Sequence, residues 1–155
     1  MIRVRVRNSQ RTLRIPIPRV RALAKRTLRS LRFTDGELSI SLVADAEIRG
    51  LNARCLGRDR ATNVLSFSLR DGDYGDVNPG VLGDVVVSTD AAARQAGRSG
   101  NTPEREVSYL VIHGILHLLG HDHLRERSRA RAMSALQERL FWEHGHLLDA
   151  DGHGR

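Results

Sequence analysis

Four of the chain's seven histidines lie within eleven residues, HGILHLLGHDH, from His113 to His123. His113 and His117 are four positions apart, so in a helix they lie on the same face, one turn apart. A buried imidazole without a partner costs roughly 1–3 kcal/mol of folding free energy, whereas one bound ion would satisfy both rings. The spacing therefore indicates a metal site more strongly than it indicates two histidines with only a packing role.

A third ligand is expected from the segment that follows this helix. Gly120 stands where helices commonly end in the left-handed conformation, and that reversal would bring the next residues back towards the two rings. Either His121 or His123 could complete the site, and the longer connection favours His123. Three imidazoles without a cysteine are typical of zinc with a fourth position open to water. Zinc lowers the pKa of such a water to about 7, so hydrolysis is the expected reaction class.

The same histidine spacing occurs in metzincin proteases, whose pattern is H-E-x-x-H-x-x-G-x-x-H. In those enzymes the glutamate after the first histidine acts as the general base. This chain has Gly114 at that position. The sequence therefore ranks peptide hydrolysis below attack on other bonds, such as a phosphodiester.

The elements that must position these residues follow from the periodicity of the apolar side chains. Four segments have the alternation or the β-branched content of strands: 2–7, 37–43, 62–69 and 81–88. Five segments have the apolar spacing of helices: 16–32, 45–56, 89–97, 102–119 and 125–144.

The helix that carries His113 and His117 is expected at the centre of the fold. From residue 109 to residue 119 it reads YLVIHGILHLL, which is apolar except for two histidines and one glycine. The sequence therefore predicts a single α+β domain with a mixed sheet of about four strands packed against four to five helices. We expect the tail, residues 145–155, to be frayed.

The charge of the chain favours a polyanionic partner. The formal net charge is +7 and the sequence pI is about 11.0, but 24 of the 25 basic residues are arginine, a bias that genomic base composition alone could produce. Cys55 is the only cysteine, so no disulfide forms within the chain. The first ten residues, MIRVRVRNSQ, lack the apolar core of a signal peptide, and no stretch is apolar enough to span a membrane. We expect a cytoplasmic protein.

The histidine run resembles the signature H-G-x-L-H-L-x-G-Y-D-H of the YbeY endoribonucleases, with His121 in place of the usual tyrosine. Three further segments resemble that family and occur in the same order along the chain: LNARCLGRDRATNVLSF, LGDVVVS and MSALQERL. The resemblance covers most of the chain. It implies one YbeY-like metal-dependent hydrolase domain over residues 1–155.

The resemblance also implies a function. Members of the family hold one zinc ion per chain through the residues that correspond to His113, His117 and His123, and they cut single-stranded RNA. The implied role is maturation of the 3′ end of 16S rRNA and ribosome quality control in the cytoplasm. The implied partners are single-stranded rRNA, the small ribosomal subunit and the GTPase Era.

One departure from the family bears on catalysis. The family's functionally important arginine aligns with Leu56, and the tyrosine before it aligns with Cys55. Arg54 or Arg58, each two positions from Leu56, could instead supply a guanidinium that clamps a phosphate. Both are therefore candidate catalytic residues. The acidic residues that follow the last histidine in the family are replaced by LRER, which could extend an RNA-binding surface or form an ordinary solvated helix face.

Several other polar residues have two interpretations. Asp122 could orient a ligand histidine or cap the turn. Asp84 could reach the site from its strand or be an ordinary strand-end carboxylate. His121 is expected at the edge of the site, and three histidines are assigned to a solvated tail: His144, His146 and His153.

The leading hypothesis is a zinc-dependent, single-strand-specific endoribonuclease that acts in 16S rRNA maturation. The alternative is a non-catalytic ribosome-assembly factor, in which zinc only pins the segment after the helix and arginines bind rRNA. The missing general base at Gly114 and the leucine at position 56 favour this alternative.

Overall fold

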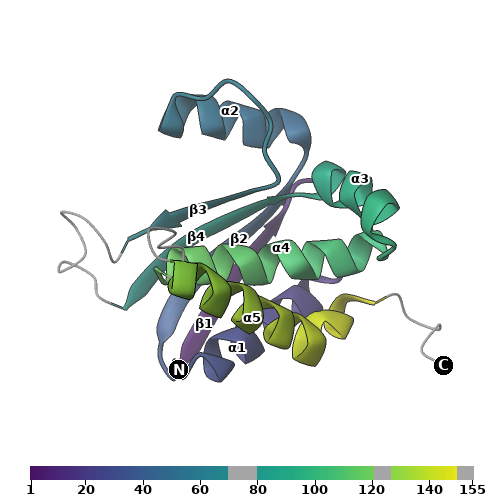
Figure 1. Ribbon diagram of the computed structural model, residues 1–155. Coiled ribbons are helices and arrows are strands. Elements are labelled where there is room, and N and C mark those ends of the chain that lie inside the picture. The colour runs from purple at the N-terminus through teal and green to yellow at the C-terminus, as the bar shows by residue number, and fades with distance from the viewer. Residues whose placement is uncertain (70–79, 121–126, 150–155) are drawn as a thin grey trace.

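The computed structural model describes residues 1–69, 80–120 and 127–149. Four strands form one sheet in the order β1-β2-β4-β3 (Figure 1). The strands are β1 (Ile2–Asn8), β2 (Gly36–Val43), β3 (Val64–Ser68) and β4 (Val81–Ser88). β1, β2 and β4 are parallel, whereas β3 is antiparallel to β4. The predicted mixed sheet is confirmed, and each strand begins and ends within two residues of its predicted range.

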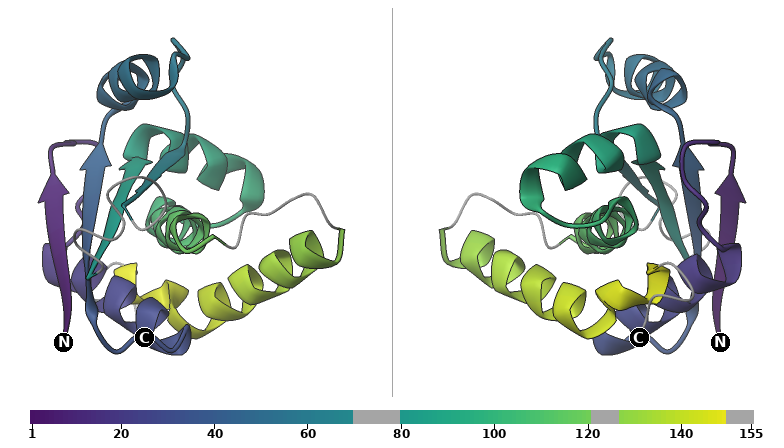
Figure 2. Two further views of the ribbon diagram at one scale, coloured as in Figure 1. Left: turned by 90° about the vertical axis from the view of Figure 1, so that its left-hand side faces the viewer. Right: turned by 90° about the vertical axis from the view of Figure 1, so that its right-hand side faces the viewer.

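Five α-helices lie in the described parts of the chain: α1 (Ile17–Ser30), α2 (Asp45–Leu56), α3 (Thr89–Ser99), α4 (Pro103–Leu118) and α5 (Arg127–His144). Figure 2 shows α4 nearly end on beside the sheet, with α3 above it and α1 and α5 below it. This is the expected α+β architecture.

The core explains why α4 is central. Ile40, Val85 and Val87 of the sheet belong to one apolar cluster with Ile112 and Ile115 of α4. A smaller cluster on the other face of the sheet joins α2 to the strands through four buried residues: Val43, Ile48, Leu65 and Val86. The sheet thus has α4 on one face and α2 on the other, and the predicted burial of the histidine helix is confirmed.

Local signals set the ends of α4. The Thr102 hydroxyl accepts a hydrogen bond from the Arg105 backbone N–H at 3.1 Å, and Pro103 follows at the first helical position. At the other end Gly120 has a φ of 83°, in the left-handed region that glycine adopts readily. The predicted N-cap and the predicted left-handed conformation of Gly120 are therefore both present.

The first part of the predicted tail is ordered, which corrects the expectation of a frayed segment from residue 145. Gly145–Leu148 form a 3-10 helix, η1, and Leu148 is only 1% exposed within the main core. The Asp149 carboxylate accepts two hydrogen bonds from Arg105 of α4, at 2.7 and 2.8 Å. His144 is also not in a solvated tail, because its Nε2 lies 2.9 Å from the Ser30 hydroxyl. A buried leucine and an ion pair therefore fix residues 145–149, and the rest of the tail lies outside the described residues.

The described ranges contain no helix that is both long enough and apolar enough to cross a membrane.

Candidate metal centre

His113 and His117 lie side by side on α4, as their spacing predicts. Their ring centroids are 4.3 Å apart and the ring planes are inclined by 50°. Both rings are half-buried. Two imidazoles this close on one helix face provide two of the nitrogen ligands that a zinc site needs.

The two rings open onto a cavity of about 400 Å³, which we call the histidine cavity. Its walls come from α4, β3 and the end of α2, and the lining consists of Leu56, Asn63, Val64, Leu65, Ser66, Ser68, His113, His117, Leu118 and Gly120. None of these described lining residues is acidic. The cavity therefore combines imidazoles with neutral hydrogen-bonding groups, a composition that does not repel a phosphodiester.

Gln137 of α5 fixes the orientation of His113. The Nδ1 of His113 lies 2.7 Å from the Oε1 of Gln137, and the Nε2 of Gln137 donates to the Tyr109 carbonyl oxygen at 3.0 Å. Because the amide nitrogen of Gln137 is used as a donor, its oxygen faces His113 and can only accept. Nδ1 therefore carries the ring proton, and the lone pair on Nε2 is left for a metal ion.

Sequence reasoning missed Gln137, although a signal was available. Met133, Leu136 and Leu140 form the buried or half-buried side of α5, and Gln137 lies among them. Gln137 is only 3% exposed. A polar side chain on the apolar side of an amphipathic helix needs a buried partner, and here that partner is the first histidine of the motif.

Tyr109 extends the row of rings by one further turn. Its ring is nearly parallel to that of His113, at 11° and a centroid distance of 6.4 Å, and it meets Phe141 edge-on at 5.6 Å. Burial raises the pKa of the Tyr109 hydroxyl, and the negative charges of Glu138 and Glu106 raise it further. The phenol therefore stays neutral at physiological pH and supports His113 by packing.

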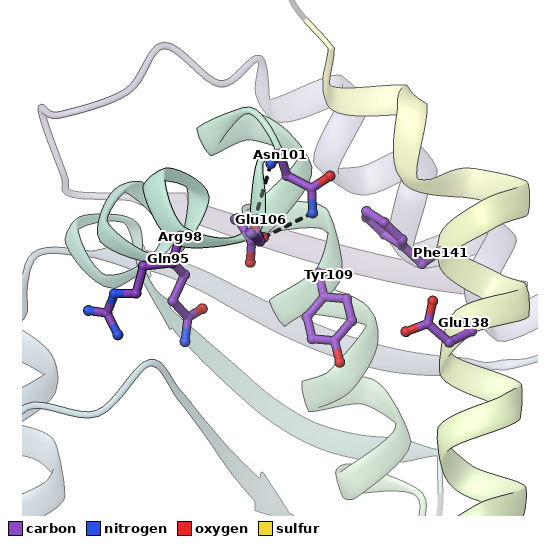
Figure 3. Close-up of a pocket in the computed structure, with 8 residues that line it drawn as sticks. Gln95, Arg98, Asn101, Glu106, Tyr109, Glu138 and Phe141 are labelled. Carbon is purple, nitrogen blue, oxygen red and sulfur yellow. Dashed lines mark hydrogen bonds between the residues drawn. The ribbon is translucent and has the colours of Figure 1, made fainter.

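A second cavity, of about 430 Å³, is lined in part by Tyr109 (Figure 3). Its wall includes two carboxylates, those of Glu106 and Glu138. Glu106 is buried and accepts hydrogen bonds from the Ser99 hydroxyl at 2.5 Å and from the Asn101 side-chain amide at 3.0 Å. Because carboxylates repel a phosphodiester, the histidine cavity is the better of the two for RNA backbone.

Gly114 faces the sheet and not the histidine cavity. A Cβ atom at this position would lie 2.5 Å from Cγ1 of Val85 and 3.1 Å from Cγ2 of Val64. The Ser66 hydroxyl donates to the Gly114 carbonyl oxygen at 2.8 Å, which holds α4 close to β3. A glutamate would not fit here, so the fold gives no place to the general base of the metzincin pattern.

Arg54 and Arg58 are both exposed and neither lines the histidine cavity. The guanidinium of Arg54 lies back along α2, with Nη1 3.1 Å from the position of a Cβ on Gly50. Arg58 follows α2, and its backbone N–H donates to the Asn52 carbonyl oxygen. Leu56, between them, does line the cavity and is 52% exposed. The two arginines therefore flank a lining residue in the sequence without lining the cavity themselves, and their catalytic role stays a prediction.

The remaining predicted residues fall into two groups. Asp84 is exposed and pairs in register with Ser39, whereas its neighbour Val85 faces α4, so Asp84 lies on the sheet face opposite the histidines. Three residues of the motif lie outside the described residues: His121, Asp122 and His123. The third ligand is therefore untested.

Comparison with known proteins supports the resemblance in the motifs. The family described as Endoribonuclease YbeY matches residues 5–145. The Endoribonuclease YbeY of Geobacter metallireducens is 41% identical over 141 residues, which cover 90% of this chain and 94% of that protein. The Endoribonuclease YbeY of Syntrophus aciditrophicus is 41% identical over 149 residues, covering 94% and 92% of the two chains.

A solved structure shares the fold. The solution structure of TM1509 from Thermotoga maritima superposes with a TM-score of 0.61 at 28% sequence identity, and the match covers 100% of both chains. The arrangement of sheet and helices described above is thus also found in an experimentally determined structure.

Proposed function

The chain belongs to the YbeY family of endoribonucleases, and we propose that it cuts single-stranded RNA with one zinc ion held by His113, His117 and His123. The observation that carries the proposal is the pair of half-buried imidazoles, 4.3 Å apart, at the wall of a cavity without acidic lining residues in its described part. The zinc ion would supply Lewis acidity towards a phosphodiester and would activate water for the attack.

The residues of this chain prepare that site. Gln137 accepts the Nδ1 proton of His113, so the opposite ring nitrogen is presented to the ion. The Asn63 side chain is half-buried in the cavity wall and offers an amide donor to a bound strand. Arg54 or Arg58, each two positions from Leu56 in the sequence, would clamp a phosphate by bidentate hydrogen bonds.

In the cell, the proposed substrate is rRNA and the proposed step is maturation of the 3′ end of 16S rRNA, together with ribosome quality control. We place this activity in the cytoplasm, with the small ribosomal subunit and the GTPase Era as partners. The positive net charge of +7 agrees with a ribosomal RNA substrate.

The deciding experiment compares the wild type with His117→Ala on a single-stranded 16S 3′-end precursor, with zinc added and free metal removed. Cleavage by the wild type and background cleavage by H117A are expected, because the variant lacks one ligand. His146→Ala is the matched control, because His146 is exposed in η1 and lines no part of the histidine cavity. Equal cleavage by H117A and the wild type would overturn the proposal, and a wild type that binds but never cuts would favour an assembly factor.

A further inference from the structure

The positive charge of the chain is concentrated at one end of the sequence. Residues 1–34 hold eleven of the 25 basic residues and none of the 18 acidic ones, and the first acidic residue is Asp35. The remaining 121 residues hold fourteen basic and all eighteen acidic residues, so their net charge is −4. A genomic preference for arginine acts on the whole chain and does not explain why acidic residues are missing from this part.

The fold places much of this charge on the solvent face of α1. The helix buries Val20, Leu23 and Leu28 in the core and contains no acidic residue. Four cations lie on its other side or directly after its end: Lys25, Arg26, Arg29 and Arg32. We call these four residues the α1 surface. Ordinary solvated helix faces mix both signs of charge, and this one does not.

The arginines of the α1 surface have no acidic partners. Arg26, Arg29 and Arg32 are exposed, and none forms an ion pair with an acidic side chain in the described parts of the chain. The acidic residue at the end of the neighbouring α5, Glu143, is instead paired with Arg139 at 3.6 Å. The guanidinium groups are therefore available to an external anion.

The α1 surface is separate from the histidine cavity. α1 packs against β1, α4, α5 and η1, and no residue of α1 lines the cavity. Figure 2 shows α1 at the bottom of the molecule and α2, whose end borders the cavity, at the top. A ligand that reaches both places must be long.

We propose that the α1 surface binds the phosphate backbone of the RNA substrate at a distance from the point of cleavage. This inference rests on the proposed function, which supplies a long polyanion as the substrate. Arginine forms bidentate hydrogen bonds with phosphate, and each neutralised phosphate releases counterions, which strengthens binding.

Two other partners fit this surface less well. The exposed large apolar side chains of the described residues are Met1, Leu56, Leu69 and Trp142, and none lies on α1, so the surface lacks the apolar anchors of a protein interface. A membrane-bound amphipathic helix inserts its apolar face into lipid, but α1 buries its apolar face in the core.

The test compares Arg26→Glu/Arg29→Glu with the control Arg98→Glu/Arg131→Glu, which changes the net charge equally at exposed arginines outside residues 1–34. Affinity is measured for a long single-stranded rRNA precursor over a range of salt concentrations, and cleavage is measured on that precursor and on a short oligonucleotide. For R26E/R29E we expect a roughly tenfold weaker affinity for the long RNA and a salt slope less steep by roughly 1.4, the value for two lost phosphate contacts. Cleavage of the short oligonucleotide stays within twofold of the wild type.

The inference is overturned if R26E/R29E binds the long RNA as tightly as the control variant does, or if its cleavage falls equally on the long and the short RNA. Binding to anionic phospholipid vesicles is measured as well. If R26E/R29E loses vesicle binding but keeps RNA binding, the inference is also overturned. Matching thermal unfolding of the two variants shows that both are folded. If the wild type cuts no RNA at all, the proposed function fails, but the binding comparison still tests the α1 surface, so the two failures are distinguishable.

Discussion

At the scale of single residues, the proposed metal centre depends on which nitrogen of His113 carries the proton. The His113–Gln137–Tyr109 chain sets that choice, since the Gln137 amide donates to the Tyr109 carbonyl oxygen and leaves only its oxygen for Nδ1. Neutral imidazole binds zinc through the nitrogen that lacks the proton. Gln137 is thus a positioning residue, and its effect should appear in metal affinity.

Gln137→Leu removes the acceptor for the Nδ1 proton. We expect zinc affinity to fall by about 10- to 100-fold, the usual effect of losing such a hydrogen bond behind a metal ligand. The measurement is competition with a chromogenic zinc chelator. Gln137→Glu keeps an acceptor oxygen and should retain more affinity than Q137L does. If both variants lose zinc equally, or neither does, the assigned role of Gln137 is wrong.

A second effect at this scale is the pH dependence of the Arg105–Asp149 ion pair. The hydrogen bonds from Arg105 lower the pKa of Asp149 below its ordinary value of 3.8. A carboxyl whose pKa is lowered by folding stabilises the folded state above the ordinary pKa, and this contribution disappears as the pH falls through the lower, folded-state value. The pair is partly exposed, so its contribution is at most about 1 kcal/mol.

Asp149→Asn should therefore lower Tm at pH 7, and the difference from the wild type should shrink near pH 3, below the ordinary pKa of 3.8, because the unfolded wild-type chain then binds a proton at Asp149. Thermal unfolding followed by circular dichroism at both pH values provides the comparison. A difference in Tm that is as large at pH 3 as at pH 7 would mean that the charge of Asp149 is not the source of the effect.

At the scale of elements, the close contact of α4 with β3 and β4 depends on a glycine. Gly114 lets the helix approach until a Cβ would be 2.5 Å from Val85, and Ser66 bonds to the helix backbone at the same place. Gly114 itself does not line the histidine cavity, but the two elements that it brings together, α4 and β3, both contribute lining residues. Helix propensity alone would favour alanine at residue 114, so packing determines the residue type.

Gly114→Ala should destabilise the protein, because overpacking costs about 1–3 kcal/mol and exceeds the gain in helix propensity of about 1 kcal/mol. Gly97→Ala is the matched control, since Gly97 also lies in a helix, α3, and nothing is within 4 Å of its Cβ position. G97A should raise the stability by about 0.5–1 kcal/mol. Urea unfolding of both variants gives the two values, and a stabilised G114A would contradict the packing argument.

The elements themselves could be read from the sequence because each has a local signal. Thr102 and Pro103 mark the start of α4, Gly120 marks its end, and the alternation in 2–7 marks a half-buried strand. The apolar side of α5 marks Gln137 as a residue that needs a partner, but local signals do not identify the partners of Gln137 and Asp149, because His113 and Arg105 are 24 and 44 positions away. Contacts of this kind depend on tertiary packing, which periodicity does not report.

At the scale of the whole molecule, the cationic segment and the proposed metal centre lie in different parts of one fold. The N-terminal part provides the excess of cations, whereas the cavity with the imidazoles lies beside β3 and the end of α2. α4 connects the two, because it packs against α1 and also carries His113 and His117. Elements that are far apart in sequence therefore pack against the same buried helix, α4. A ligand bound to His113 and His117 should stabilise the folded state of the whole domain.

Zinc should accordingly raise the Tm of metal-stripped protein. An ion that binds only the folded state stabilises it by RT ln(1 + [L]/Kd), about 2.7 kcal/mol at a free concentration of one hundred times Kd. For a domain of this size that corresponds to a rise in Tm of roughly 5–10 °C. H117A should show little of this rise, because one of the two ligands on α4 is gone, whereas H146A should respond like the wild type. Differential scanning calorimetry with and without zinc measures both, and an equal rise in H117A and the wild type would place the ion elsewhere on the chain.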